Sequence, residues 1–179
     1  MAYKYKDYAR VCNVVADKKK NCRFLVEYEL ENGDENKKAL IIMKNPSKAD
    51  DQISDQTINN VLEYMHEFQY SKVFVMNLIP EYATNPNDIS DNVSMDILNR
   101  NDKLIQDISN QVSKVFVAWG GSNGINEVFY NSRILSVKKC LTDKKLYCYD
   151  INAVNKQPIH PSYSHWKKGK EEKDFVEYQ

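Results

Sequence analysis

The stretch SKVFVMNLIP, residues 71–80, decides the fold class of this sequence. Its apolar run is short, contains β-branched residues and is bounded by polar positions, which favours a strand covered on both faces. LIIM, residues 40–43, and VFVA, residues 115–118, have the same character. Strands of this kind are typical of parallel sheets that lie between two layers of helices.

Helical spacing fills the intervals between these strands. In residues 51–70 the apolar side chains recur every three or four positions, as on one face of a helix, and Ser54 or Asp55 can cap its start. Two more helix candidates and a fourth strand follow, at residues 94–112, 123–140 and 144–152. The alternation predicts an α/β three-layer sandwich with a central four-stranded parallel sheet.

A polar segment, residues 31–38, separates two further strand-like stretches, residues 21–30 and 37–45. This arrangement predicts a β-hairpin at the start of the core. The length of 179 residues fits a single domain. Within that domain we expect an N-terminal extension (1–22), an α/β core (23–165) and a polar C-terminal tail (166–179).

Charge and composition exclude several classes of protein. The chain has 25 basic and 25 acidic side chains, so no bulk positive field draws it onto nucleic acid, and contact with a polyanion needs a local patch. No apolar run approaches the roughly 20 residues that span a bilayer. The first residues, MAYKYKDYAR, lack the apolar segment of a secretory signal. We therefore expect a cytoplasmic protein with no membrane partner.

The cysteine pattern indicates neither disulfides nor a metal. The four residues Cys12, Cys22, Cys140 and Cys148 form no CxxC pair and lie near few histidines. They fit reduced, mostly buried thiols. We expect no zinc site and no cofactor.

Polar or conformationally special residues follow each of the four predicted parallel strands. They are Asn45-Pro46-Ser47, Asn77, Trp119-Gly120-Gly121 and His160-Pro161-Ser162. Proline fixes φ and removes a backbone donor, so the two X-Pro-Ser turns are rigid mounts for Asn45 and His160. Glycines allow the backbone to approach a ligand closely. We call the residues that directly follow each of these strands its exit. Because ligands bind outside the carboxyl ends of parallel strands, the four exits together predict a binding site.

Each of these features has an ordinary structural interpretation when it is taken alone. Asn-Pro-Ser is a common turn and cap sequence, a glycine pair is usually a turn, and the lysines near the end fit a solvated tail. His160 by itself fits a loop hydrogen bond as well as chemistry. Asp50 and Asp51, with Asp55, leave open a Mg²⁺ site.

The four exits, in the order IIMKNPS, VFVMNLIP, VFVAWGG and HPSYS, resemble the strand ends of the uracil-DNA glycosylase superfamily. Members of that superfamily carry a water-positioning motif after the first core strand and an asparagine that reads the flipped base. A hydrophobic-Trp-Gly strand end and a His-Pro-Ser loop follow. The pairing of Asn-Pro with His-Pro-Ser most resembles the single-strand-selective branch. Lys44 and Ser47 stand where these enzymes usually have glycine, and Tyr163 replaces the proline that follows His-Pro-Ser.

The chain resembles more closely a bacterial and phage family that is known only as a domain of unknown function. The pattern of that family is NPS-x-A-D, D-x-T, N-L, an Asn-Asp pair, W-G and a late H-P. This sequence carries it over roughly residues 23–165, at 45–50, Asp55 and Thr57, Asn77-Leu78, Asn101-Asp102, Trp119-Gly120 and His160-Pro161.

The glycosylase resemblance implies a role for each residue of the predicted site. Asn45 would orient the attacking water, and His160 would donate a hydrogen bond to O2 of the departing base. Asn77 would read O4 and N3–H of a uracil-like base. Further substrate contacts are expected from Ser47, Trp119, Gly120, Gly121, Ser162 and Tyr163, a wedge from Tyr163 or Trp166, and contacts to backbone phosphates from Lys167, Lys168 and Lys170.

The sequence thus predicts a nucleobase-recognising protein, specifically a monofunctional hydrolase that cleaves the N-glycosidic bond of a uracil-like or modified pyrimidine. The neutral net charge favours single-stranded nucleic acid or a free nucleotide over a duplex as its partner. Two alternatives stay open. One is a non-catalytic nucleotide-binding module, which the missing glycines favour, and the other is a Mg²⁺-dependent phosphate-handling enzyme.

Overall fold

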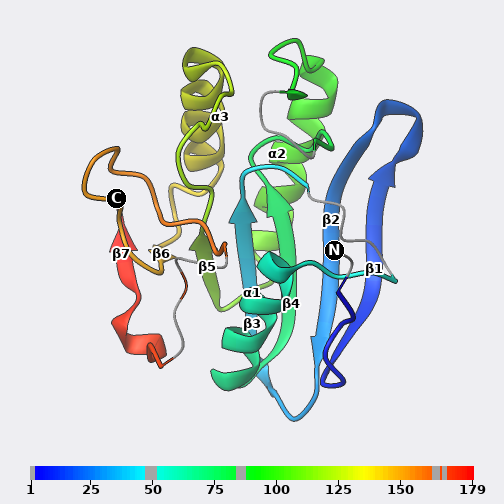
Figure 1. The fold of residues 1–179 in the computed structure, drawn as a ribbon, viewed down its shortest axis with the longest axis vertical. Coiled ribbons are helices and arrows are strands. Elements are labelled where there is room, and N and C mark those ends of the chain that lie inside the picture. The colour runs from blue at the N-terminus through cyan, green and yellow to red at the C-terminus, as the bar shows by residue number, and fades with distance from the viewer. Residues whose placement is uncertain (1–2, 47–51, 84–87, 163–165, 167–168) are drawn as a thin grey trace.

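Strand β3 (Asp34–Met43) lies at the centre of the structure, and its last five residues are almost completely buried. The computed structural model describes residues 3–46, 52–83, 88–162, 166 and 169–179 (Figure 1). In that part of the chain the sheet has seven strands, in the order β1-β2-β4-β3-β5-β6-β7. The other six are β1 (Ala9–Asp17), β2 (Cys22–Leu30), β4 (Tyr70–Asn77), β5 (Lys114–Val117), β6 (Leu146–Cys148) and β7 (Val176–Tyr178).

The four central strands are parallel, as the sequence predicts. β3 pairs in parallel with β4 on one side and with β5 on the other, and β5 pairs in parallel with β6. In this register Met43 lies opposite Asn77, and Ile42 lies opposite Val117. The carboxyl ends of β3, β4 and β5 therefore meet at one edge of the sheet.

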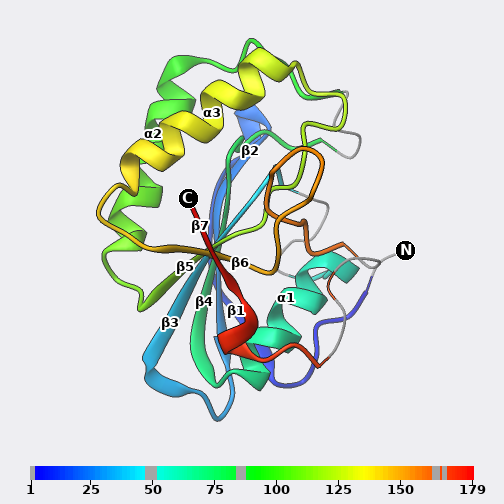
Figure 2. The ribbon, with the colours of Figure 1, turned by 90° about the vertical axis from the view of Figure 1, so that its left-hand side faces the viewer.

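Helices cover both faces of this sheet and give the expected three layers. Helix α1 (Gln56–Glu67) lies on one face, and α2 (Met95–Ser109) and α3 (Glu127–Cys140) lie on the other (Figure 2). Because side chains alternate along a strand, β3 contributes to two cores. Ile41 and Met43 pack in the α1 core, and Leu40 and Ile42 pack in the α2–α3 core.

The N-terminus of α1 is capped as the sequence indicates. The Asp55 carboxylate accepts a hydrogen bond from the backbone N–H of Ile58 at 2.8 Å, which satisfies one of the free donors of the first turn. None of the helices in the described part of the chain has the length and apolar character that a membrane span requires.

The predicted hairpin between residues 21–30 and 37–45 is wrong. β2 pairs antiparallel with β1 and with β4, and β4 separates it from β3. Residues 31–33 therefore cross past the start of β4, and residues 34–38 already belong to β3. A side chain on Gly33 would lie 2.4 Å from the Tyr70 carbonyl oxygen. The hairpin of this protein joins β1 to β2 through the short 3-10 helix Lys18–Lys20, so residues from the expected N-terminal extension form an edge strand.

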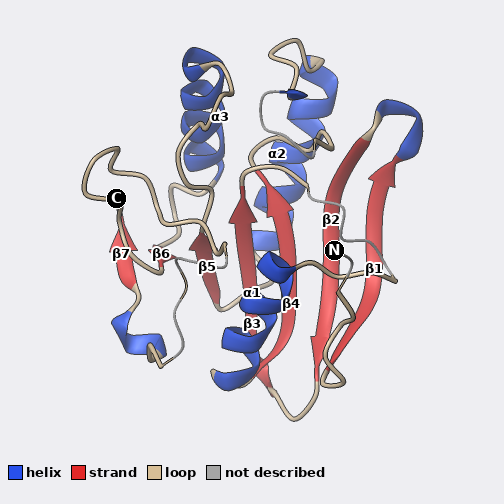
Figure 3. Ribbon diagram, in the orientation of Figure 1, coloured by secondary structure: helices blue, strands red, loops and turns tan. Residues whose placement is uncertain are grey.

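The described residues of the segment 166–179 do not form a polar tail. They include a 3-10 turn (Glu172–Asp174) and β7, which pairs antiparallel with β6 at the edge of the sheet (Figure 3). Trp166, Phe175 and Tyr178 are buried. The many charged residues of this segment hide the spacing of its aromatic side chains, and these side chains complete the two cores.

Glu172 ties this C-terminal segment to the amino ends of the parallel strands. Its carboxylate accepts hydrogen bonds from Lys37 Nζ and Lys114 Nζ, both at 2.8 Å, and from the Tyr70 hydroxyl at 2.7 Å. Burial alone would raise the pKa of this carboxyl. The hydrogen bonds from Lys114, Lys37 and Tyr70 outweigh burial and lower the pKa to about 2.

We expect Glu172→Gln to destabilise the protein by roughly 2 kcal/mol at pH 7, because three hydrogen bonds to a carboxylate are lost or weakened. The ordinary pKa of 4.5 lies above the folded value, so this contribution is complete above pH 4.5 and is lost as the pH falls toward 2. Urea unfolding at pH 7 and pH 3 measures both effects. Glu177→Gln, which removes an exposed ion pair with Lys145, is the control and should change stability by less than about 0.5 kcal/mol. Equal effects of the two variants at pH 7 would contradict the anchoring role.

Candidate functional site

The candidate site lies where the connections from β3 and β5 leave the sheet in opposite directions. α1 follows β3 and covers one face, whereas α3 follows β5 and covers the other (Figures 1 and 2). Between two such exits the edge of a parallel sheet is left open, and ligands of α/β proteins bind in this crevice. The residues that the sequence singles out follow these strands.

Asn77 is the last residue of β4, and its side chain is only 1% exposed. Its backbone carbonyl accepts a hydrogen bond from Asn101 Nδ2 of α2 at 2.9 Å. Its side-chain oxygen, Oδ1, is buried and has no hydrogen-bond partner among the described residues. A buried acceptor without a donor lowers the stability of a fold. The Oδ1 atom of Asn77 is therefore left to accept a hydrogen bond from a ligand.

A buried polar cluster on α2 and α3 holds the chain just after Asn77. Arg133 Nε donates to the Leu78 carbonyl at 3.1 Å, and its guanidinium forms a bidentate ion pair with Asp102. Asn101, next to Asp102, donates to Asn77 as described above. The sequence marks the Asn-Asp pair through its family pattern, but nothing in that pattern identified Arg133, which lies on another helix.

The loop that carries His160 is fixed from three directions. Gly120 N donates to the Pro158 carbonyl at 3.0 Å, and Asn60 Nδ2 of α1 donates to the Pro161 carbonyl at 3.1 Å. Trp166 Nε1 donates to the Ile159 carbonyl at 3.2 Å. These contacts make the loop a rigid mount, as its two prolines indicate.

Gly120, the first of the two glycines after β5, is required by its backbone conformation and by its neighbour. Gly120 has a φ of +70°, and a side chain there would approach the His160 Cβ to 3.1 Å. A side chain on Gly121 would lie 2.7 Å from Asn155 Nδ2, which is the end of an exposed side chain and can move away. The structure therefore brings the Gly120 and His160 exits into direct contact. Ser162 lies half-buried in the same loop as His160.

Asn45 is half-buried after β3, and its amide nitrogen is already engaged. Nδ2 donates to the carbonyl of Ala83 at 2.9 Å and to that of Pro46 at 3.2 Å. These bonds hold Asn45 against the segment that follows β4. Only the side-chain oxygen is left to hold a water molecule, which fits the role expected for Asn45.

Two tryptophans and one lysine that were expected to contact the base or the backbone phosphates point into the protein instead. Trp119 is fully buried, and its Nε1 donates to Gln157 Oε1 at 2.9 Å, so its ring is part of the core and not a surface on which a base can stack. Trp166 is 5% exposed and stacks on Tyr149, so it is not a wedge. Lys170 Nζ donates to the Tyr149 carbonyl and lies over its ring, which directs this cation toward the protein.

Several predicted residues lie outside the described part of the chain. They are Ser47, Asp50, Asp51, Tyr163, Lys167 and Lys168. Asp55, the third carboxylate of the Mg²⁺ alternative, caps α1. The described residues contain no cluster of metal-ligating side chains.

Lys44 is a residue of this edge that the sequence marks only as a departure from glycine. It follows β3 directly and is 5% exposed, and its backbone carbonyl accepts a hydrogen bond from Ile79 N at 3.0 Å. Its ammonium group forms no ion pair with a described carboxylate. Its Nζ lies 5.9 Å from the centre of the Tyr130 ring. Burial lowers the pKa of Lys44 to about 8, because the charged form loses its hydration.

Tyr130 joins Lys44 to the other exits and also lines a cavity. Its hydroxyl donates to the Gly120 carbonyl at 2.8 Å. The cavity, of about 290 Å³, is lined mainly by small polar and amide side chains. They are Gly121, Ser122, Asn123, Glu127, Tyr130, Asn131, Asn155 and Gln157.

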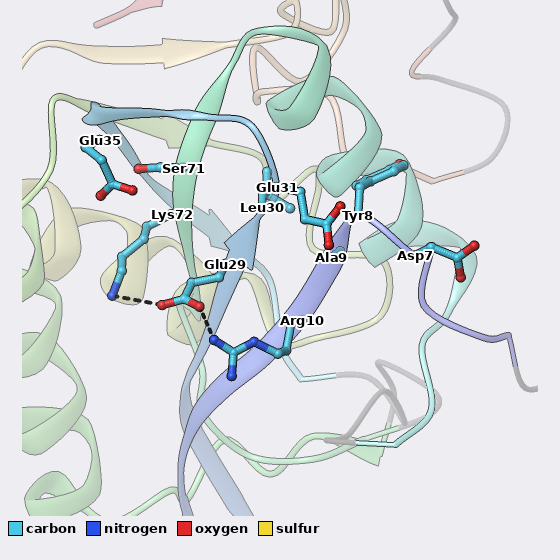
Figure 4. Close-up of a pocket in the computed structure, with 10 residues that line it drawn as sticks. All are labelled: Asp7, Tyr8, Ala9, Arg10, Glu29, Leu30, Glu31, Glu35, Ser71 and Lys72. Atoms are coloured by element: carbon cyan, nitrogen blue, oxygen red, sulfur yellow. Dashed lines mark hydrogen bonds and ion pairs between the residues drawn. The ribbon is translucent and has the colours of Figure 1, made fainter.

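A larger pocket, of about 480 Å³, lies at the amino ends of β3 and β4 and is shown in Figure 4. Three of its charged groups pair with one another, since Glu29 bonds to Arg10 and lies within 3.7 Å of Lys72. The carboxylates of Asp7, Glu31 and Glu35 line the same pocket. The Arg10 hydrogen bond lowers the pKa of Glu29, which keeps this carboxyl ionised.

The fold and the polar edge together define an α/β protein with a candidate ligand site at the switch point of its sheet. A family model described as "Protein of unknown function (DUF1643)" matches residues 23–162, and the chain belongs to this family. The match confirms the resemblance to a family of unknown function, and the link to uracil-DNA glycosylases stays an expectation. No curated protein and no solved structure gave a significant match.

We expect Gly120→Ala to displace His160, because the new methyl group would contact its Cβ and because alanine is strained at a φ of +70°. Gly169→Ala is a matched control, since Gly169 has a φ of +90° and nothing within 4 Å of the new methyl group. Both variants should lose about 1 kcal/mol of stability through backbone strain. Only Gly120→Ala should shift the NMR signals of the His160 ring. Unchanged His160 signals in that variant would contradict the close contact.

We expect Lys44→Met to stabilise the protein at pH 7 by up to about 3 kcal/mol, because methionine fills a similar volume without a buried charge. The folded pKa of about 8 lies below the ordinary 10.5, so the unfolded chain binds more protons between these values. Stability of the wild type should therefore rise with pH from 8 to 10.5, and the variant should lack this rise. Lys139→Met, at an exposed position of α3, should change stability by less than about 0.5 kcal/mol. A destabilised Lys44→Met would show that the amine is already satisfied within the fold.

Proposed function

We propose that this protein binds a nucleobase at the carboxyl edge of its parallel sheet and hydrolyses the N-glycosidic bond of a uracil-like or modified pyrimidine. The observation that carries the proposal is the buried Oδ1 of Asn77, which has no donor among the described residues. A primary amide offers an acceptor and two donors in one plane. The N3–H and O4 of uracil are the complementary pair.

The position of His160 supports the second half of the proposal. Its loop is fixed by bonds from Gly120, α1 and Trp166, so the backbone that carries the imidazole needs little reorganisation during a reaction. A fixed donor beside O2 of the base stabilises the negative charge that develops as the glycosidic bond breaks. Such a donor typically contributes 3–4 kcal/mol to catalysis, on the order of a hundredfold to a thousandfold in rate.

Asn45 would position the attacking water molecule. Its amide nitrogen is held by Ala83 and Pro46, so its oxygen has a defined direction in which to accept a hydrogen bond from water. In the reaction the water oxygen bonds to the sugar C1′, the C1′–N bond breaks, and the base leaves with the second proton. Asn45 would act through position only, because an amide has no useful pKa.

A non-catalytic nucleotide-binding module is the second candidate. It is favoured by the bulk of Lys44, which stands where a glycine would admit the sugar more closely. The neutral net charge and the inward direction of Lys170 favour single-stranded nucleic acid or a nucleotide as the ligand for either candidate.

We expect Asn77→Leu to lower base release at least a hundredfold while leaving the free energy of unfolding equal or higher. The reason is that leucine of similar size removes a buried acceptor that has no partner in the protein. Single-stranded oligonucleotides carrying uracil or modified pyrimidines serve as substrates, and mass spectrometry of released base and abasic product is the measurement.

Asn99→Ala removes an exposed amide of α2 and is the control for loss of an asparagine. His160→Ala should lower base release to a similar extent as Asn77→Leu. Ligand binding without base release would favour the non-catalytic module. Full activity of Asn77→Leu would exclude Asn77 as the reader of the base.

A further inference from the structure

Lys44 is a largely buried lysine whose ammonium group has no carboxylate partner in the described part of the protein. The residue is 5% exposed, and the contact that its Nζ makes is with the face of the Tyr130 ring. Buried cations in folded proteins are nearly always paired, because an unpaired one costs several kcal/mol. A group that the fold accommodates at such a cost is a candidate for chemistry.

A short series of contacts connects this amine to the His160 loop. Lys44 Nζ lies 5.9 Å from the centre of the Tyr130 ring, and the Tyr130 hydroxyl donates to the Gly120 carbonyl at 2.8 Å. Gly120 in turn contacts His160, since a methyl group on Gly120 would lie 3.1 Å from the His160 Cβ. Lys44 therefore belongs to the same edge of the sheet as the proposed base-binding residues.

The environment of Lys44 favours the reactive form of an amine. Desolvation is what lowers its pKa to about 8, so a substantial fraction of the side chain is neutral near pH 7.5. Desolvated lysines of this kind form Schiff bases with carbonyl substrates. Base release from a nucleotide leaves an abasic sugar, whose open-chain form is an aldehyde.

We propose that Lys44 forms an imine with the aldehyde carbon of an abasic sugar, so that the protein holds the product of base release covalently. This inference rests on the proposed function. The neutral Nζ attacks C1′ and forms a C–N bond, and the carbonyl oxygen takes up the two amine protons and leaves as water. The step is a condensation with no change in oxidation state, so it needs no cofactor.

The experiment uses a preformed abasic site, so it does not depend on base release or on the identity of the base. The full-length protein is incubated with a single-stranded oligonucleotide that contains one abasic site, and sodium borohydride is added. Reduction of the imine gives a stable secondary amine, seen as a covalent protein–DNA adduct on a denaturing gel. We expect peptide mass spectrometry to place the adduct on Lys44.

Two controls separate covalent chemistry from simple binding. An oligonucleotide with tetrahydrofuran in place of the abasic sugar has no aldehyde and should give no adduct. Lys44→Met should reduce the adduct at least a hundredfold while binding the tetrahydrofuran oligonucleotide as the wild type does. Lys139→Met, which removes an exposed lysine of α3, should leave the adduct unchanged.

An adduct that forms equally in Lys44→Met, or that maps to another lysine, would overturn the proposal. Loss of tetrahydrofuran binding in Lys44→Met in proportion to the loss of adduct would also overturn it, because Lys44 would then be a phosphate contact. Base release without an adduct would reject the imine alone. An adduct without base release from any substrate would reject the proposed hydrolase and leave Lys44 as an aldehyde-reactive residue.

Discussion

Burial of β3 on both faces and along both edges is the constraint on which the rest of the structure depends. Its residues from Ala39 to Ile42 are 0% exposed, and they pair in parallel with β4 and β5. Because crossovers between parallel strands are right-handed, the connection from β3 to β4 and the connection from β5 to β6 lie on opposite faces of the sheet. The open edge between those connections is a consequence of the strand order and needs no special residue of its own.

The two edges of the sheet treat their charged groups differently. At the amino ends of the strands, Glu172 satisfies Lys37, Lys114 and Tyr70 together. At the carboxyl ends, Lys44 is largely buried with no carboxylate partner in the described structure, and the side-chain oxygen of Asn77 is buried without a hydrogen-bond donor. The groups at the amino ends thus stabilise the fold, whereas the groups at the carboxyl ends lower its stability. Such a contrast is what a ligand site produces when its binding groups are organised before the ligand arrives.

The sequence predicted the central part of the fold well because that part depends on simple periodicity. The continuous apolar runs of β3, β4 and β5 and the helical spacing of α1 are local signals, and Asp55 is a cap that sequence alone can recognise. The partner of β2 could not be predicted in this way. Whether β2 pairs with β4 or with β3 depends on where residues 31–33 cross the sheet, and Gly33 is the one local sign of that crossing.

The candidate site was predictable to a similar extent. The sequence placed Asn77 and Gly120 at strand ends, and the order of strands brings these ends to one edge. It could not show that Trp119 and Trp166 are buried, because an aromatic residue beside glycine or lysine looks the same in a core and at a ligand surface. Nor could it distinguish Lys44 from the many solvated lysines, since burial of a single charge is a property of tertiary packing.

The His160 loop depends on a part of the chain that is made after it. Trp166 bonds to the Ile159 carbonyl from below, and the segment that contains Trp166 is anchored in turn by Glu172 and β7. During synthesis on the ribosome, β3, β4 and β5 emerge well before residues 166–178. The central strands can therefore emerge while the His160 loop still lacks its bond from Trp166, and this loop gains its full set of contacts only when translation has passed β7.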